Sequence, residues 1–297
     1  MSDDPTPTSS AGVAELTERL RRGGYLADRG LATSVYVAMA LGRPLLLEGE
    51  VGVGKTELAK VLATVLDRRL IRLQCYEGID THQALYEWDY ARQMLQIRAL
   101  SEHNLADESQ VDKLFGPKFL LERPLLTAVR EGDRAVLLID EIDRADDEFE
   151  AFLLELLSDY QITIPEIGTI VAEAPPLVIL TSNRTRELHD ALKRRCMYHW
   201  VGYPTTEREV EIIMVRAPEA GETLARKVVE AVHRLRGLDL AKPPGVAETL
   251  DWVATLNLLD RPDLDASTVR DTLGAVVKER DDLELVLEHL EEIAVDG

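Results

Sequence analysis

The sequence is poor in cysteine and lacks an excess of basic charge. Only two cysteines occur among the 297 residues, Cys75 and Cys196, and neither has partner histidines at the spacing of a metal site. This scarcity argues against a disulfide framework and against a zinc site, so we expect two buried, reduced thiols. Lysine and arginine number 34 against 54 aspartates and glutamates, which leaves a formal net charge of -20. Such an acidic chain repels a polyphosphate backbone, which argues against nucleic acid as the partner.

No apolar run approaches the length that a bilayer requires. The composition is 45% hydrophobic and 30% charged, which is typical of a water-soluble globular protein. Residues 1–12, MSDDPTPTSSAG, are acidic and rich in Pro and Ser, and they lack the basic and apolar regions of a secretory signal. We therefore predict a disordered tail at 1–12 and a cytoplasmic location. The length of the chain favours a large domain with a smaller one appended.

Short apolar runs alternate with amphipathic stretches from Leu16 to about Tyr203, which is the pattern of helices flanking a mostly parallel sheet. Continuous hydrophobicity in these runs suits strands buried on both faces. The predicted strands cover residues 44–48, 70–75, 135–140, 177–181 and 197–201. The fold class is therefore α/β, a parallel five-stranded sheet sandwiched by helices in a domain at 13–204.

Two regions depart from this alternation. The run YQITIPEIGTIV, at 160–171, alternates branched apolar residues around a Pro and a Gly, and this predicts a β-hairpin that projects from the core. After Pro204 the strand pattern disappears and helical periodicity continues to the end. We predict a small all-α lid domain at 205–297.

A glycine-rich segment follows the first predicted strand. It reads G-x-x-x-x-G-K-T and is followed by ELAKVLATVL, a good helix former. Its glycines let backbone N–H groups wrap a phosphate in conformations that a Cβ would obstruct. Lys55 then reaches the β and γ phosphates, and Thr56 offers its hydroxyl to Mg²⁺ at the positive end of the new helix. The pattern predicts a P-loop that binds ATP through Gly49, Glu50, Val51, Gly52, Val53, Gly54, Lys55, Thr56 and Glu57.

The apolar strand at 136–139 ends in two acids, Asp140 and Glu141, in the form of a Walker B motif. Asp140 is predicted to hold Mg²⁺, and Glu141 to orient and deprotonate the attacking water. The alternative is a pair of carboxylates that cap the following helix, but a cap does not explain the preceding P-loop.

A neutral amide, Asn183, follows the strand at 177–181. It lies just past the carboxyl end of a parallel strand, where ligands of open α/β sheets bind, so we predict that it positions the lytic water. Ser-Asn after a strand is also an ordinary turn, which is the alternative for this residue.

The three motifs in this order, with the hairpin and the helical region behind them, resemble the AAA+ superfamily. The stretches RPLLLEGEVGVGKTELAK, LLIDEIDRAD and LTSNRTRELHDALKRRC are similar to the MoxR family, including relatives encoded with carbon monoxide dehydrogenase maturation genes. The resemblance runs from about Gly24 to the end, with specific motifs up to Pro204. It implies a chaperone-like, Mg²⁺-dependent ATPase that forms a homo-oligomeric ring, a hexamer, and remodels or matures a client protein or metalloenzyme complex. A protein with a von Willebrand factor A domain is an implied partner.

The resemblance also implies roles for single residues. Asn183 takes the sensor-1 role, and Arg195 stands where the family has an arginine finger that acts on the neighbouring subunit's nucleotide. Many relatives have Asp-Arg-Phe there, whereas this chain has Arg194-Arg195-Cys196, so the finger is Arg194 or Arg195. A basic helix end that complements its own dipole is the alternative for either arginine.

Three further assignments follow from the resemblance. Tyr25 and Leu26 fall where such proteins contact adenine, although core packing explains them equally well. Asp265 can cap a helix that carries Arg270 near its first turn, which matches the sensor-2 region. The hairpin at 160–171 resembles a family insertion that faces the ring interior.

Two other functions are compatible with the same ATPase core. A nucleic-acid-stimulated AAA+ motor is the first, and the acidity of the chain weighs against it. A scaffold that binds nucleotide without hydrolysis is the second, and it leaves Glu141, Asn183 and the arginines unexplained.

Overall fold

The structure, a computed structural model, describes residues 10–102 and 116–295. The chain forms two compact units, each made of several segments. The first holds the described residues up to Arg19, Ala27–Glu48 and Ala59–His199, and the second holds Leu20–Leu26, Gly49–Leu58 and the residues from Trp200 onward. Residues 1–9 of the predicted tail lie outside the described residues, and helix α1 (Ser10–Arg22) begins at the next position.

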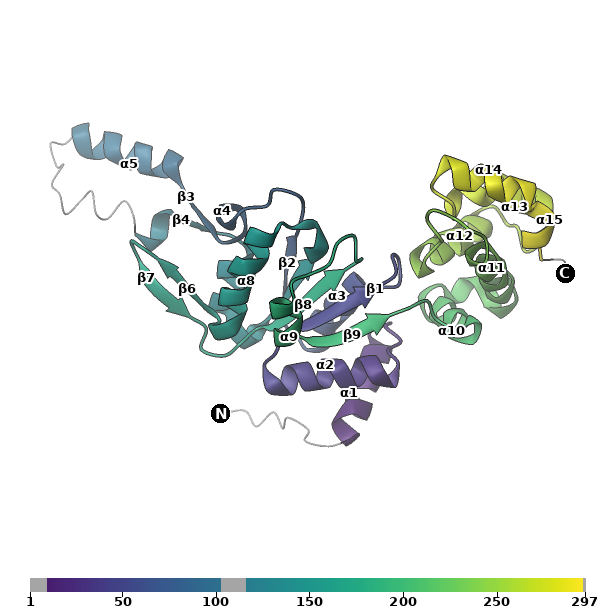
Figure 1. Cartoon of the computed structure of the whole chain (residues 1–297), viewed down its shortest axis with the longest axis horizontal. Helices are drawn as coiled ribbons and strands as arrows, with labels where there is room; N and C mark the ends of the chain where they lie inside the picture. The colour runs from purple at the N-terminus through teal and green to yellow at the C-terminus, as the bar shows by residue number, and fades with distance from the viewer. Residues whose placement is uncertain (1–9, 103–115, 296–297) are drawn as a thin grey trace. The chain divides into compact units, whose positions relative to one another are not determined.

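A five-stranded sheet contains all five strands that the sequence predicts (Figure 1). The strand order is β2-β5-β8-β1-β9, and the pairs β2/β5, β5/β8 and β1/β8 are parallel. Strand β9 runs in the same direction as β1, because Met197 N donates to Pro44 O (2.7 Å) at one end and Glu50 N donates to Val201 O (3.2 Å) at the other. The strands are β1 (Leu45–Gly49), β2 (Arg69–Gln74), β5 (Ala135–Asp140), β8 (Leu177–Ser182) and β9 (Met197–Val201).

Burial separates the central strands from the edge strands. Every residue of β1, β5 and β8 is buried, as their continuous apolar runs predict. The expectation of burial on both faces is wrong for β2 and β9, where exposed residues include Leu70 (36% exposed) and Trp200 (42% exposed). These two strands form the edges of the sheet, where the covering layers end.

Helices flank the sheet and share one core with it (Figure 1). The buried side chains of α7 and α8 pack in the same cluster as Leu137 and Ile139 of β5, which is how amphipathic helices cover a sheet. Among the described residues, no helix is both long and apolar enough to cross a membrane. The helices of this part are α1, α2 (Arg29–Leu41), α3 (Lys55–Val65), α7 (Pro124–Glu131), α8 (Asp147–Asp159) and α9 (Asp190–Arg195).

Two small antiparallel pairs of the described residues lie outside the main sheet. The predicted hairpin is confirmed as β6 (Gln161–Ile164) and β7 (Gly168–Val171). The second pair, β3 (Tyr86–Trp88) with β4 (Leu120–Glu122), was not predicted, because three-residue strands that pair across a long insertion leave no periodicity to read. Helix α5 (Tyr90–Glu102) and the 3-10 turn η2 (Pro117–Phe119) lie between these two strands, and α4 (Thr81–Ala84) precedes β3.

The chain from Thr205 to Val295 is helical, as predicted, apart from one β-bridge between Leu264 and Val295. Its core is built from aliphatic residues of α11 around Trp252 of α12, which is fully buried and donates its ring N–H to Thr272 Oγ1 (2.8 Å). The elements are α10 (Thr206–Arg216), η5 (Pro218–Ala220), α11 (Gly221–Arg236), α12 (Val246–Leu258), α13 (Ala266–Thr272), η6 (Leu273–Ala275), α14 (Arg280–Glu288) and α15 (Leu290–Ile293).

Candidate functional site

The glycine-rich loop joins β1 to α3, the strand–loop–helix context that its sequence predicts. Gly52 and Gly54 have φ angles of 74° and 91°, which residues with a Cβ rarely adopt. The helix begins at Lys55, which is buried. Its ammonium group donates to Gly49 O (2.8 Å) and Glu50 O (2.6 Å). The loop therefore already curls around the one side chain that is predicted to bind phosphates.

Residues of the second unit support this loop from its helical part. Ala247 N, in the first turn of α12, donates to Gly52 O (3.2 Å), and Gly245 packs directly on the Gly52 backbone. At the start of α3, Glu57 accepts a hydrogen bond from Arg216 Nη1 (2.6 Å). The sequence did not indicate Gly245 or Arg216 as site residues, because both come from a region that it predicts only as helical.

The remaining predicted residues of this unit are Tyr25, Leu26 and Arg270. A carbon of the Tyr25 ring lies 3.6 Å from the position that a Cβ on Gly54 would occupy, so the tyrosine lies beside the loop, and Leu26 follows it half-buried. Asp265 caps α13 as predicted, since Thr268 N donates to its Oδ1 (2.7 Å). Arg270 is exposed in the last turn of that helix.

The two acids at the end of β5 pair with different arginines and share one threonine. Asp140 is buried, and its Oδ2 accepts hydrogen bonds from Nε (3.0 Å) and Nη2 (2.6 Å) of Arg72 on β2. Glu141 has a left-handed backbone conformation, with φ 55° and ψ 50°, and its carboxylate pairs with Arg144 Nε (2.8 Å). Thr181 on β8 contacts both acids: its hydroxyl donates to Asp140 Oδ1 (2.6 Å) and accepts from Glu141 N (2.9 Å).

The loop that carries Asn183 is tied to the same region by Asp143. This buried carboxylate accepts hydrogen bonds at Oδ2 from Asn183 N (3.2 Å), Thr185 N (2.8 Å) and Thr185 Oγ1 (2.8 Å). Asp143 comes two residues after Glu141, so one short segment both presents an acid and anchors the asparagine loop. The carboxyl ends of β1, β5 and β8 lie at the same edge of the sheet, because the three strands are parallel neighbours.

Arg194 and Arg195 end the short helix α9, and both are exposed. Within the described part of the chain, neither guanidinium forms a hydrogen bond or an ion pair. The amino end of the helix is anchored, since His189 N donates to Oε2 of the fully buried Glu150 (2.9 Å). The two arginines therefore extend from a fixed helix into solvent.

Both cysteines are free and buried, as expected. Cys75 N donates to Asp140 O (2.9 Å), which places the thiol next to the acids. Burial, reinforced by the negative charges of Asp140, Asp143 and Glu141, raises the pKa of the Cys75 thiol to about 12.

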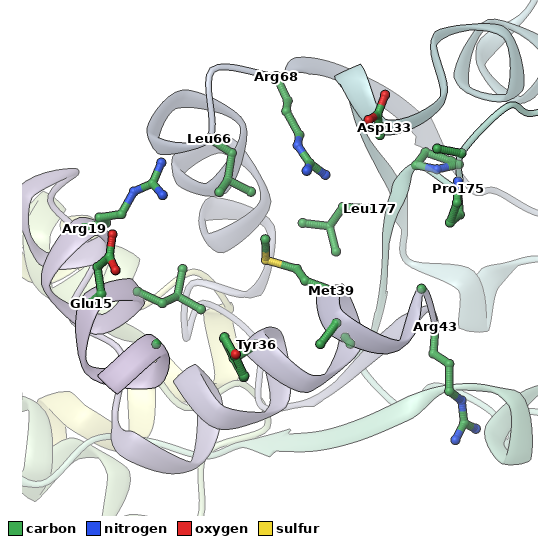
Figure 2. Close-up of a pocket in the computed structure, with 17 residues that line it drawn as sticks. Glu15, Arg19, Tyr36, Met39, Arg43, Leu66, Arg68, Asp133, Pro175 and Leu177 are labelled. Atoms are coloured by element: carbon green, nitrogen blue, oxygen red, sulfur yellow. The ribbon is translucent and has the colours of Figure 1, made fainter. Parts of the chain in front are cut away.

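A cavity of about 520 Å³ lies elsewhere in the first unit and contains none of the predicted site residues. Figure 2 shows Met39, Leu66 and Leu177 pointing into it from α2, the end of α3 and the start of β8. Because Leu177 is the first residue of β8, the cavity belongs to the amino ends of the strands, opposite the edge that carries Asp140 and Asn183. It is therefore separate from the candidate site.

Thr181, Asp143, Arg72 and Arg144 are the polar residues that sequence reasoning missed around the two acids. The only available signal was position: Asp143 and Arg144 lie two and three residues after Glu141, and Thr181 lies two residues before Asn183. Arg144 pairs with Glu141 in its own segment, whereas Arg72 and Thr181 reach the acids from other strands and Asp143 binds the loop after β8. The register that brings those strands together is a property of the sheet.

Comparison with known proteins matches residues 44–196 to the family described as AAA domain, dynein-related subfamily. An uncharacterized Staphylococcus aureus protein (strain bovine RF122) is 31% identical over 55% of this chain and 57% of its own length. An uncharacterized Staphylococcus saprophyticus protein is 24% identical, over 67% of this chain and 70% of its own.

The uncharacterized protein YehL of Escherichia coli K12 is 29% identical over 67% of this chain, and the match spans about half (53%) of YehL. Among solved structures, a mutant of Thermotoga maritima RuvB aligns with 89% of this chain and 70% of its own, with a TM-score of 0.48 and 18% identity. The family match includes the P-loop, the two acids of β5 and the asparagine loop. This protein therefore belongs to the AAA domain family, in its dynein-related subfamily, and is an AAA+ ATPase.

Proposed function

We propose that this ATPase binds ATP and Mg²⁺ at residues 49–57 together with the end of β5, and that it works as a MoxR-type, ring-forming machine that remodels or matures a client protein. The observation that carries the proposal is the convergence of the three parallel strand ends that bear the P-loop, Asp140 with Glu141, and Asn183. This edge is where ligands of open α/β sheets bind.

The residues present fit a nucleotide with its metal ion. The glycines leave the loop backbone without side chains that would fill a phosphate cradle, and the buried Lys55 supplies a positive charge inside it. Thr56 and Asp140 would hold Mg²⁺, which prefers oxygen ligands. When bound, the ion neutralises charge on the phosphates. Arg72 and Thr181 support this role, because together they fix the orientation of the Asp140 carboxylate.

Hydrolysis needs a base and a means of orienting water. In the proposal, Glu141 accepts a proton from the attacking water, and the Asn183 amide orients that water. The support is positional: Thr181 holds the backbone of Glu141, and Asp143 holds the backbone of Asn183. Tyr25 and Leu26 would contact the adenine, and Arg270 would act as sensor 2.

The ring is proposed on the exposure of Arg194 and Arg195. An arginine finger stabilises charge that develops on the phosphates of the neighbouring subunit, and two exposed guanidinium groups without partners in the described residues suit that task. The same proposal includes a hexameric ring, a von Willebrand factor A partner and a pore-facing hairpin at 160–171, which rest on the resemblance of the motif stretches to MoxR proteins. It also includes domains at 13–204 and 205–297, which rest on the loss of the strand pattern after Pro204.

The test is ATP turnover per subunit, with Mg²⁺, measured against protein concentration while light scattering follows assembly. A specific activity that rises as rings form supports a shared site, whereas a flat activity while scattering reports monomers contradicts the ring. Mixing Glu141→Gln with the Arg194→Ala/Arg195→Ala double variant tests the finger itself. The first variant supplies intact arginines and the second supplies an intact Glu141, so ATP turnover per subunit should be higher in the mixture than in either variant alone. Stimulation of turnover by DNA or RNA, with none by protein, would favour the motor instead.

A further inference from the structure

The carboxyl end of α9, which carries Arg194 and Arg195, is bound by a third arginine. Arg43 donates from Nε to Arg195 O (3.0 Å), and from Nη2 to Arg194 O (2.7 Å) and Cys196 O (3.5 Å). The last carbonyls of a helix have no partner within the helix, and a cation there is favourable to the helix dipole. Arg43 therefore caps the helix end through the backbone of both candidate finger residues.

The position of Arg43 is itself fixed. It follows Gly42, which ends α2 in a left-handed conformation (φ 59°), and Arg43 N donates to Ala38 O (3.0 Å). Tyr160 Oη also donates to Gly42 O (3.1 Å). Arg43 is among the residues that line the cavity, and Figure 2 shows its side chain turned away from Met39 and Leu177. Its direction is thus set by the turn between α2 and β1.

The residue after Arg43 completes the attachment. Pro44 O accepts a hydrogen bond from Met197 N (2.7 Å), the first residue of β9. Two consecutive residues before β1 thus hold both sides of the α9–β9 junction. A helix of six residues is not stable by itself, so these contacts and the Glu150 anchor at the other end decide where α9 points.

The chemistry of the three arginines divides them into two roles. Arg43 directs its donors to backbone carbonyls, whereas Arg194 and Arg195 are exposed and form no hydrogen bond or ion pair with the described residues. We propose that Arg43 is a positioning residue for the arginine finger: it aims the end of α9 so that a finger side chain reaches the nucleotide of the adjacent subunit. This inference rests on the proposed trans-acting finger.

The experiment uses the full chain with Arg43→Gln, which removes the charge and the guanidinium fork. We expect kcat for ATP to fall by about 10- to 100-fold, since small displacements of a catalytic group have effects of that size. The KM for ATP should stay within about 2-fold, because Arg43 does not belong to the P-loop. Arg43→Lys keeps the charge but loses the planar set of donors, so its kcat should lie between those of the wild type and Arg43→Gln. Arg69→Gln is the matched control, since it removes an exposed arginine that pairs with Glu131 (3.0 Å), and it should leave kcat unchanged.

Mixing separates positioning from a general structural role. Arg43→Gln subunits keep an intact base, so Glu141→Gln subunits, which have an intact finger, should restore turnover in mixed rings. Mixing Arg43→Gln with the Arg194→Ala/Arg195→Ala variant should restore nothing, because both lack a working finger. If Arg43→Gln does not assemble, Arg43→Lys carries the same two mixtures.

Two outcomes overturn the inference. The first is a wild-type kcat in Arg43→Gln, or a loss of activity that Glu141→Gln subunits do not restore although they do restore the Arg194→Ala/Arg195→Ala variant. Either result rules out the positioning role of Arg43 and leaves the proposed finger intact. The second is a failure of Glu141→Gln subunits to restore turnover of the Arg194→Ala/Arg195→Ala variant. The trans-acting finger is then wrong, and so is the role of Arg43 that depends on it.

Discussion

The hydroxyl of Thr181 donates a hydrogen bond of 2.6 Å to Oδ1 of Asp140 on the neighbouring strand. The same oxygen accepts from Glu141 N at 2.9 Å, although a left-handed conformation such as that of Glu141 costs about 1 kcal/mol for a residue with a Cβ. One buried hydroxyl thus orients the acid proposed for Mg²⁺ and holds the backbone of the acid proposed as the base.

Replacing Thr181 tests this arrangement with a matched pair. Thr181→Val keeps the shape and removes the hydroxyl, which leaves Asp140 Oδ1 and Glu141 N without this partner. We expect kcat to fall by about 10-fold or more, and the free energy of unfolding to fall by about 1–3 kcal/mol. Thr181→Ser restores the hydroxyl and should recover most of the activity. Equal kcat for the valine and serine variants would contradict the role of the hydroxyl.

Lys55→Ala removes the positive charge that the P-loop surrounds. We expect ATP affinity to fall by about 100-fold, because a buried, charge-assisted contact to phosphate contributes on the order of 3 kcal/mol. Titration with a fluorescent ATP analogue measures the change, and the thermal midpoint of the apo protein checks that folding is intact. Wild-type ATP affinity in this variant would show that Lys55 does not bind the phosphates.

Glu141→Gln separates binding from chemistry. The amide keeps the size of the side chain but cannot take a proton, so turnover should fall by about 10²- to 10⁴-fold. ATP affinity should be unchanged, and the proposed ring should be more stable with ATP bound. Single-turnover hydrolysis and light scattering measure the two effects. Hydrolysis at the wild-type rate would show that another group is the base.

Gly245→Ala tests the contact between α12 and the P-loop. A Cβ at this position would lie 2.6 Å from both Gly52 Cα and Val51 O, so the loop backbone must move, and we expect ATP affinity to weaken by about 10-fold. Gly274→Ala is the control, since no atom of the described residues lies within 4 Å of its added Cβ. Identical affinities in the two variants would show that the loop accommodates the methyl group.

The cysteines should react slowly in the folded protein. Burial is the main cause that raises the pKa of both Cys75 and Cys196 to about 12, so at pH 8 about one thiol in 10⁴ is ionised, and the thiolate is the reactive form. A chromogenic disulfide reagent should label both only after denaturant is added. Rapid labelling of either thiol in the native protein would contradict its burial.

Local patterns predicted the elements that depend on local physics. The five apolar runs became strands, the run around Pro165 and Gly168 became the hairpin, and Asp265 caps a helix. Each depends on neighbouring residues: apolar runs of strand length, turn residues, and a cap three residues from its donor. The pair β3–β4 was missed because its strands lie far apart in sequence.

Local motifs were enough to predict an ATPase, since the segment from Gly49 to Thr56, the pair Asp140–Glu141, and Asn183 occur in this order and have few other uses together. The contacts that hold those residues could be learned only from the folded chain. Thr181 reaches Asp140 through the register of parallel strands, Gly245 meets the P-loop through packing of the helical region, and Arg43 caps a helix some 150 residues away in sequence. Hydrogen bonds between distant segments depend on how the chain packs, and that information is not local to any motif.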